Sequence, residues 1–258
     1  MASKPLAIIG GVGPGTGASV ARKFARSYAV VLLARNPANY ESLVKEINSS
    51  GGKAVGISTD ISSASSIHSA FEKIKSEMGK TGVAAAVFNV SGGFVKKPFL
   101  QLNLEEFESG FEANCKGAFL FSQAVLPLLL STVDAKPEHP PTLIFTGATA
   151  SVKSSATSAT FASGKFALRA LSQSLAREFG PQGIHVSHAI IDGVIDLERT
   201  KNWVLSDKPD AKISPDARHV LNMADLLRRP DEPRNASAGD IKSESASTGL
   251  KLVAGSKL

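Results

Sequence analysis

The densest run of glycines in the chain could bind a phosphate group. Residues 10–17 read GGVGPGTG, directly after the apolar run 6–9 and before a stretch of helical length. Glycines permit a tight turn and let backbone amides approach a pyrophosphate, while a helix amino terminus supplies partial positive charge. Such a turn can also simply pack a helix on a strand. Its place in an alternating α/β pattern predicts a dinucleotide site made by Gly11, Gly13, Gly15, Thr16 and Gly17.

The end of the second apolar run favours NADP over NAD. Ala34 stands where an NAD-binding chain would hold the ribose hydroxyls with a carboxylate, and Arg35 follows it. An arginine there could pair with the extra 2′-phosphate of NADP. The alternative is an ordinary solvated arginine at a strand end.

Short apolar runs alternate with amphipathic stretches of helical length. The predicted strands are 6–10, 29–34, 54–58, 83–90, 142–146 and 185–191, and the predicted helices are 18–27, 39–49, 63–78, 104–130 and 161–179. Runs such as 29–34 are apolar throughout, which is typical of parallel strands covered by helices on both faces. The sequence therefore predicts an α/β fold, a single Rossmann-type domain with a doubly wound parallel sheet.

The pattern weakens towards the end of the chain. We expect the dinucleotide-binding domain to span 1–227, with a lid at 197–227 whose apolar residues, Trp203 among them, either line a substrate pocket or pack the lid down. Residues 228–258 form a polar tail, in which 228–247 is predicted to be a loop or disordered. The segment TGLKLVAG at 248–255 could form a last short strand.

Composition narrows the classes of function. The 258 residues are 43% hydrophobic and 20% charged, enough apolar mass for one large core. A single cysteine, Cys115, rules out an intramolecular disulfide and a thiolate zinc site, and we expect no bound metal. The net charge is +6 but the basic residues are scattered, so no nucleic acid partner is expected. The apolar run at 6–9 is too short for a signal or a membrane span, and no membrane partner is expected.

Later motifs resemble the short-chain dehydrogenase/reductase family. Asn89-Val90-Ser91-Gly92 ends the fourth predicted strand, Asn114 lies in a predicted helix, and Lys165 lies on the helix after the fifth strand. With the glycine loop, over residues 5–197, this order resembles the family pattern of Asn-Asn-Ala-Gly, a helical Asn and Tyr-x-x-x-Lys. The resemblance implies further cofactor contacts by Asp60, Asn89, Lys165 and Ile195.

Two positions depart from that family. Phe161 and Ala148 stand where a tyrosine that transfers the proton and a serine that binds the substrate oxygen would be. Neither side chain has an ionisable proton or a donor, so the usual relay cannot operate through them. The resemblance leaves Asn114 and Lys165 as catalytic residues, and either a nearby hydroxyl or a water held by these two delivers the proton. The hydroxyls near the frame are those of Thr149, Ser151, Thr160 and Ser163.

Two hypotheses about function remain open at this point. The resemblance implies an NADP-dependent oxidoreductase acting on a carbonyl or alcohol of a small apolar metabolite, with a modified proton-transfer group. The losses at Phe161 and Ala148 instead favour a catalytically silent dinucleotide-binding partner or sensor. In the family, the helices that hold Asn114 and Lys165 commonly form subunit interfaces, so we expect a homo-oligomer. The tripeptide at 256–258, SKL, matches the address read by the peroxisomal import receptor, which predicts a peroxisomal rather than a cytoplasmic location.

Overall fold

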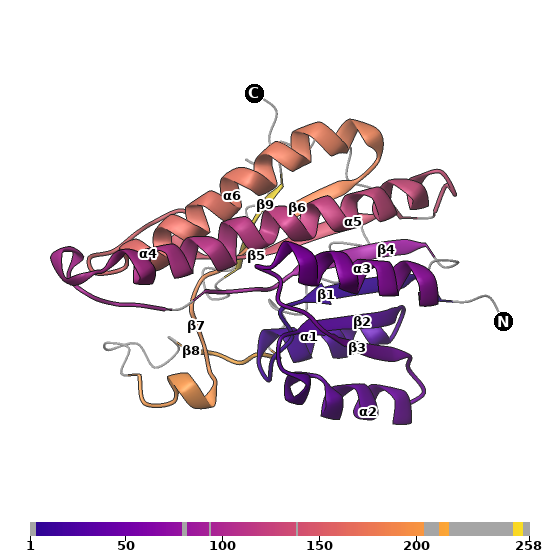
Figure 1. Ribbon diagram of the computed structural model, residues 1–258, viewed down its shortest axis with the longest axis horizontal. Coiled ribbons are helices and arrows are strands. Elements are labelled where there is room, and N and C mark those ends of the chain that lie inside the picture. Colours follow the sequence, from indigo (N-terminus) through magenta and orange to yellow (C-terminus); the bar gives the residue numbers. More distant parts are fainter. Residues whose placement is uncertain are drawn as a thin grey trace.

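A seven-stranded sheet lies at the centre of the computed structural model, which describes residues 4–78, 82–92, 94–137, 139–203, 212–216 and 250–254 (Figure 1). Its strand order is β3-β2-β1-β4-β5-β6-β9. The first six strands pair in parallel: β1 (Leu6–Gly10), β2 (Ala29–Ala34), β3 (Ala54–Ser58), β4 (Val83–Phe88), β5 (Thr142–Ala148) and β6 (His185–Ile191). The order reverses beside β1, and in such sheets ligands bind at the carboxyl ends of the strands at this reversal.

Helices cover both faces of the sheet, as Figure 1 shows. On one face lie α1 (Thr16–Ala25) and α2 (Glu41–Ser49), and on the other lie α3 (Ala64–Met78), α4 (Leu104–Phe111), α5 (Gly117–Val133) and α6 (Ala159–Phe179). Successive residues of a strand point to opposite faces, so Ile8 packs into the core under α3, α5 and α6, and Ile9 into the core under α1 and α2. The predicted Rossmann-type α/β fold is confirmed.

The predicted helix at 104–130 is one long helical stretch with a change of winding inside it. A π-helical turn, Glu112–Lys116, joins α4 to α5. Within the described residues, Leu104–Val133 is the one helical stretch long and apolar enough to cross a membrane by length and composition. Phe121, Val125 and Leu129 on it are completely buried in the core, which accounts for much of its apolar composition.

Short strands complete the fold near the carboxyl end. The last short strand expected within 248–255 is present as β9 (Leu250–Ala254), which pairs antiparallel with β6. β7 (Val194–Ile195) and β8 (Lys212–Ile213) form a separate parallel pair. Most of the predicted lid, the polar stretch 228–247 and the terminal tripeptide lie outside the described residues, and their predicted properties stay predictions.

Candidate active site

Gly11 sits where the first strand turns into the glycine loop, and its backbone has a φ of +85°. The amides of Gly11 and Val12 donate to the carbonyl of Leu33, at 3.0 and 3.1 Å. A Cβ added to Gly11 would lie 2.7 Å from the carbonyl oxygen of Asn89. Any other residue at this position would be strained by both its backbone conformation and this contact.

The rest of the loop is closely packed at Gly15 and Gly17 and open at Gly13. A Cβ on Gly17 would meet the carbonyl oxygen of Gly11 at 2.8 Å, and a Cβ on Gly15 would meet the side chain of Leu197 at 2.7 Å. A Cβ on Gly13 would meet no described atom within 4 Å. Gly15 caps α1 without a side-chain hydrogen bond, and Thr16 is its first, half-buried residue. The amino end of α1 therefore offers a pyrophosphate an approach beside Gly13.

Asn89 ties the glycine loop to the fourth strand. Its side-chain Nδ2 donates to the carbonyl of Gly11 at 3.0 Å, and its backbone amide donates to the carbonyl of Gly10 at 2.8 Å. Two hydrogen bonds from one residue fix the distance between β1 and β4 at the point where the strand order reverses. The predicted site residue Asn89 thus has a positioning role that the structure shows directly.

The two predicted adenosine contacts lie at the exposed ends of β2 and β3. Arg35 is exposed, and among the described residues its guanidinium forms no ion pair. The hydroxyl of Ser58 donates to the carbonyl of Arg35 at 2.9 Å, which joins the two strand ends. Asp60 is also exposed, and its Oδ1 accepts from the amide of Ser62 at 3.0 Å. Arg35 is therefore available to a charged ligand, whereas part of Asp60 is engaged in its own turn.

Lys165, on α6, and Asn114, on the π-helical turn, are both buried. Lys165 is 3% exposed, and its Nζ donates to the carbonyl of Thr146 at 2.9 Å. Burial lowers the pKa of Lys165 to about 8. Asn114, on the π-helical turn, is completely buried, and its Nδ2 donates to the carbonyl of Gly110 at 2.9 Å. Its Oδ1 has no hydrogen-bond partner within the described part of the chain.

Phe161 lies beside the buried lysine, and Ala148 lies on the strand that accepts its hydrogen bond. The ring of Phe161, one helical turn before Lys165 on α6, has its centroid 5.8 Å from Nζ. Ala148 ends β5 two residues after Thr146, which accepts the hydrogen bond from Lys165. Lys165 thus contacts Phe161 directly and binds the strand on which Ala148 lies.

Ser151 and His188 form a buried pair next to Ala148 that the sequence did not predict. Ser151 Oγ accepts from the amide of Ala148 and lies 3.1 Å from His188 Nε2. Burial, aided by the positive charges of Lys165 and Arg169, lowers the pKa of His188 to about 3, so this histidine is neutral at neutral pH. The sequence signal that could have revealed the pair is a polar residue, His188, within a buried strand.

An aromatic cluster borders the site on the side of the lid. The ring of Phe94 lies 5.3 Å from that of Phe161 and 5.1 Å from that of Trp203, centroid to centroid. Phe94 is 46% exposed and Trp203 38% exposed. Trp203 both packs on a neighbour and presents apolar surface, so the two expectations for the lid residues are not exclusive at this position.

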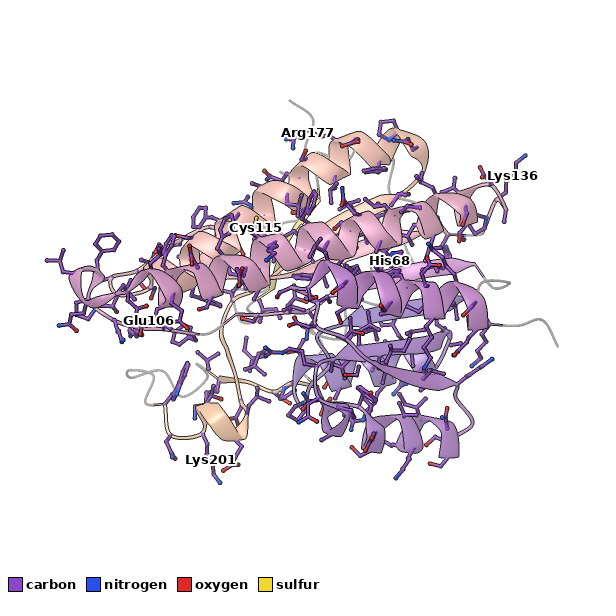
Figure 2. All side chains as sticks on the ribbon, viewed as in Figure 1. His68, Glu106, Cys115, Lys136, Arg177 and Lys201 are labelled. Carbon is purple, nitrogen blue, oxygen red and sulfur yellow. The ribbon has the colours of Figure 1, made fainter. Side chains whose placement is uncertain are left out.

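Ile195 lies in β7, half-buried against the core under α1 and α2. Its carbonyl accepts a hydrogen bond from Thr200 Oγ1 at 2.7 Å, which holds the start of the lid in a turn. Cys115, labelled in Figure 2, follows Asn114 on the π-helical turn. Burial raises the pKa of its thiol, so Cys115 is not an activated nucleophile.

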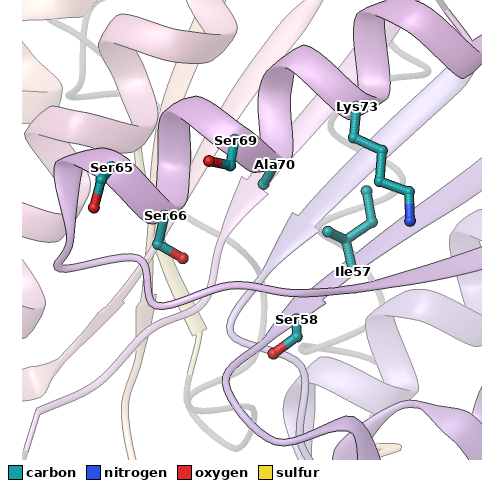
Figure 3. A pocket seen from close by; sticks show the side chains of 7 residues that line it. All are labelled: Ile57, Ser58, Ser65, Ser66, Ser69, Ala70 and Lys73. Carbon is teal, nitrogen blue, oxygen red and sulfur yellow. The ribbon is translucent and has the colours of Figure 1, made fainter.

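A groove of about 370 Å³ lies between β3 and α3, beside the backbone of Arg35 and Asp60 (Figure 3). Its lining consists of Ile57, Ser58, Ser65, Ser66, Ser69, Ala70 and Lys73. None of the predicted site residues lines it. The groove is therefore not the place where Lys165 and Asn114 could act.

The sequence profile of the short chain dehydrogenase family matches residues 5–207. The chain belongs to this family. Among its curated relatives, oxidoreductase UcpA of Salmonella typhimurium is 25% identical over 204 residues, which cover 79% of this chain and 74% of that protein. The 3-oxoacyl-[acyl-carrier-protein] reductase FabG of Escherichia coli is 26% identical over 208 residues, covering 81% and 80% of the two chains.

Solved structures of short-chain dehydrogenases have the same fold. A short-chain dehydrogenase from Rhodopseudomonas palustris matches with a TM-score of 0.70 and 28% identity, over 90% of this chain and 94% of that one. An alcohol dehydrogenase from Thermococcus sibiricus, complexed with 5-hydroxy-NADP, matches with a TM-score of 0.74 and 25% identity, over 89% and 93%. This short-chain dehydrogenase therefore belongs to a family of oxidoreductases, and its glycine loop and buried lysine lie within the matched region.

Proposed function

We propose that this chain is an NADP-dependent oxidoreductase acting on a carbonyl or alcohol group of a small apolar metabolite, with a modified proton-transfer group. The observation that carries the proposal is that three groups lie towards the carboxyl ends of neighbouring parallel strands: Arg35 after β2, the glycine loop after β1, and the buried Lys165, which binds Thr146 on β5. A dinucleotide bound at this edge of the sheet would contact all three.

The residues at the carboxyl edge of the sheet fit a bound nicotinamide dinucleotide. Gly13 leaves open the space that a pyrophosphate would need, and the amino end of α1 points its amides there. Lys165 and Asn114 would hold the ribose and the reacting end. When bound, the cofactor supplies or accepts the hydride, so the chain itself must orient the substrate and move a proton.

NADP is preferred over NAD in this proposal because of the charges at the end of β2. Arg35 is an exposed cation without an ion pair among the described residues, and Ala34 offers no carboxylate to a ribose diol. A charge-assisted contact with the 2′-phosphate contributes about 1.5–3 kcal/mol. The T. sibiricus relative is complexed with an NADP derivative.

The proposed preference for an apolar substrate rests on the aromatic cluster of Phe94, Phe161 and Trp203. Their partly exposed rings provide apolar contact area beside Lys165, and they offer a polar substrate few hydrogen bonds. The carbonyl or alcohol group would then face the polar end of the site.

Cofactor binding and turnover test the proposal together. NADPH and NADH are titrated by fluorescence, and small ketones, aldehydes and alcohols are scanned with each cofactor. Binding of NADPH with turnover of at least one apolar carbonyl supports the proposal. Tight binding of NADPH without turnover, in the wild type and in a variant with both hydroxyls restored, would favour the silent partner, and absence of binding would refute both.

We also propose that the chain forms a homo-oligomer through its long helices. Phe107, Phe111 and Phe119 along the α4–α5 stretch and Phe166 on α6 are large apolar side chains with between 36% and 47% of their surface exposed. Burial of such surface favours association. Sedimentation of the wild type and of a Phe119→Glu variant tests this, and a monomeric wild type would refute it.

A further inference from the structure

Side chains from other elements hold the end of β5. The carbonyl of Thr146 accepts the hydrogen bond of Lys165, on α6, at 2.9 Å. The amide of Ala148 donates to Ser151 Oγ at 3.1 Å, within the short 3₁₀ helix Thr149–Ser151 that follows the strand. The end of this strand is therefore fixed by side chains as well as by its pairing with β6.

His188, on β6, completes this arrangement from the neighbouring strand. Its Nε2 lies 3.1 Å from Ser151 Oγ, and the two residues are 3% and 0% exposed. The serine hydroxyl keeps its own proton after it accepts from the Ala148 amide, and a neutral imidazole has one nitrogen that donates and one that accepts. The histidine and the serine can therefore bond in either direction, and this bond orients the serine towards Ala148.

Gly147 provides the space for the imidazole ring. A Cβ added to this glycine would lie 2.1 Å from His188 Nε2, which is shorter than real Cβ contacts. The backbone of Gly147 does not lie in the left-handed region, so the ring, and not the path of the chain, excludes a side chain here. The ring thus lies against the strand between Thr146, which holds Lys165, and Ala148, which binds the serine.

The electrostatic surroundings of His188 favour a supporting role. Burial, aided by the positive charges of Lys165 and Arg169, lowers the pKa of His188 to about 3. Its Nδ1 has no hydrogen-bond partner among the described residues. A ring that stays neutral near neutral pH, and whose Nε2 is bonded to a buried serine, acts as a fixed support and not as an acid or a base.

The position of Lys165 depends on the end of β5. The carbonyl that accepts the hydrogen bond from its Nζ belongs to Thr146, two residues before Ala148. The side chain of Ala148 has no donor, so the contacts that this strand end makes with a ligand come from its backbone and from the lysine that the backbone holds. A shift of the strand end would therefore move both.

We infer that His188 and Ser151 are positioning residues, which fix the end of β5 and through it the place of Lys165 and Ala148 in the candidate active site. The inference rests on the proposed function, because it assigns the pair to the same site. Both side chains are buried, so they act through the strand and not by touching a substrate. Their loss should affect the reaction and spare cofactor binding, because Asn89 holds the glycine loop by separate hydrogen bonds.

The first test measures how firmly Ala148 is held, without any reaction. Hydrogen exchange of the Ala148 amide is followed by NMR in the full chain labelled with 15N. Ser151→Ala removes the acceptor and should speed this exchange about tenfold. His188→Leu should speed it as well, because the serine hydroxyl loses the partner that orients it. His188→Gln should keep the wild-type exchange rate, since its side-chain amide can bond to the hydroxyl.

Ser172→Ala is the matched control for this test. Ser172 is also 3% exposed, but its hydroxyl donates to the carbonyl of Arg169 within the same helix, α6. The Ala148 amide should exchange in this variant at the wild-type rate. Unchanged exchange in Ser151→Ala, or an equal acceleration in Ser172→Ala, would overturn the inference.

The second test measures the consequence for the reaction. The kcat and KM for reduction of an apolar carbonyl and the Kd of NADPH are determined for the same variants and for Ser151→Ala/His188→Leu. Each of the two single losses should lower kcat about 10-fold to 10²-fold. The double variant should fall no further, because the two residues act as a unit. His188→Gln should keep the wild-type kcat, and the Kd of NADPH should stay unchanged throughout.

The outcomes separate this inference from the proposed function. A full kcat in Ser151→Ala, or losses that multiply in the double variant, would overturn the inference and leave the proposed function in place. If the wild type turns over too slowly to measure, the same substitutions are made in Ala148→Ser/Phe161→Tyr. Absence of turnover in both backgrounds would overturn the proposed function, and amide exchange would still decide whether the pair fixes the end of β5.

Discussion

The contacts of the glycine loop are made mainly by the backbone, whereas those around Lys165 are made by side chains. At the loop, the contacts are made by backbone atoms, such as the amides of Gly11 and Val12 and the carbonyl that accepts from Asn89. Around Lys165 they are made by the side chains of Lys165, Asn114 and Ser151.

The two regions therefore tolerate different changes. One added carbon at Gly11 collides with the backbone of the neighbouring strand. Around Lys165, the absence of oxygens from Phe161 and Ala148 leaves the helix and strand in place but removes a proton relay. A fold can keep its cofactor-binding geometry while its acid–base chemistry changes, because the first depends on chain path and the second on a few atoms.

Gly11→Ala should have the largest effect, because it disrupts the glycine loop, whose contacts are made by backbone atoms. The left-handed conformation alone costs about 1–2 kcal/mol for a residue with a Cβ. The contact at 2.7 Å with Asn89 should also displace the loop and abolish NADPH binding. Gly51→Ala is the matched control, since its φ is +80° but an added Cβ meets nothing within 4 Å. Equal melting temperatures and equal NADPH titrations for the two variants would contradict the comparison.

The double substitution Ala148→Ser/Phe161→Tyr should restore a proton relay beside Lys165, where the contacts are made by side chains. Because Lys165 and the end of β5 are in place, the pair should raise the rate of carbonyl reduction by about 10²–10⁴-fold. Melting temperature should change little, since both positions are only half-buried. Steady-state rates of the wild type, both single variants and the double variant measure the effect. An active wild type that gains nothing would show that these two positions no longer face the substrate.

Arg35→Ala should change which cofactor is bound without changing the loop. Loss of the proposed charge-assisted contact should weaken NADPH binding by about tenfold or more and leave NADH binding unchanged. Arg22→Ala is the control, because that arginine is already paired with Glu46 at 2.7 Å on the outer side of α1 and α2. Fluorescence titration of all three proteins checks it, and a variant with an undiminished NADPH preference would assign the preference elsewhere.

Substitution of His188 by glutamine should have the smallest effect near neutral pH. The quantity that it changes is the free energy of unfolding. Its pKa is lowered by burial to about 3, so the unfolded chain binds its proton first as the pH falls from 6.5. The contribution of neutral His188 is complete above pH 6.5 and is lost towards pH 3, by about 1.4 kcal/mol per pH unit. Urea unfolding of wild type and His188→Gln at several pH values measures the difference. Identical pH slopes would mean that His188 is not buried in its neutral form.

The sequence by itself determined the architecture. The six parallel strands lie within two residues of their predicted limits, because fully apolar runs such as Ala29–Ala34 can be buried only in a sheet covered on both faces. The glycine loop could also be predicted from the sequence, because the tight turn requires glycine itself. The absence of hydroxyls at Phe161 and Ala148 could also be predicted, because the spacing of these positions from Lys165 can be counted in the sequence.

Only the tertiary structure decided what the remaining polar groups do. Thr149, Ser151, Thr160 and Ser163 are equivalent in the sequence, but in the structure the first three hydroxyls bind Asp192, His188 and Val95, and Ser163 is exposed. The π-helical turn that carries Asn114 and the packing of Leu197 on Gly15 were likewise not predicted. Local patterns encode which face of an element is buried, whereas a hydrogen-bond partner from another strand depends on how distant segments are placed together.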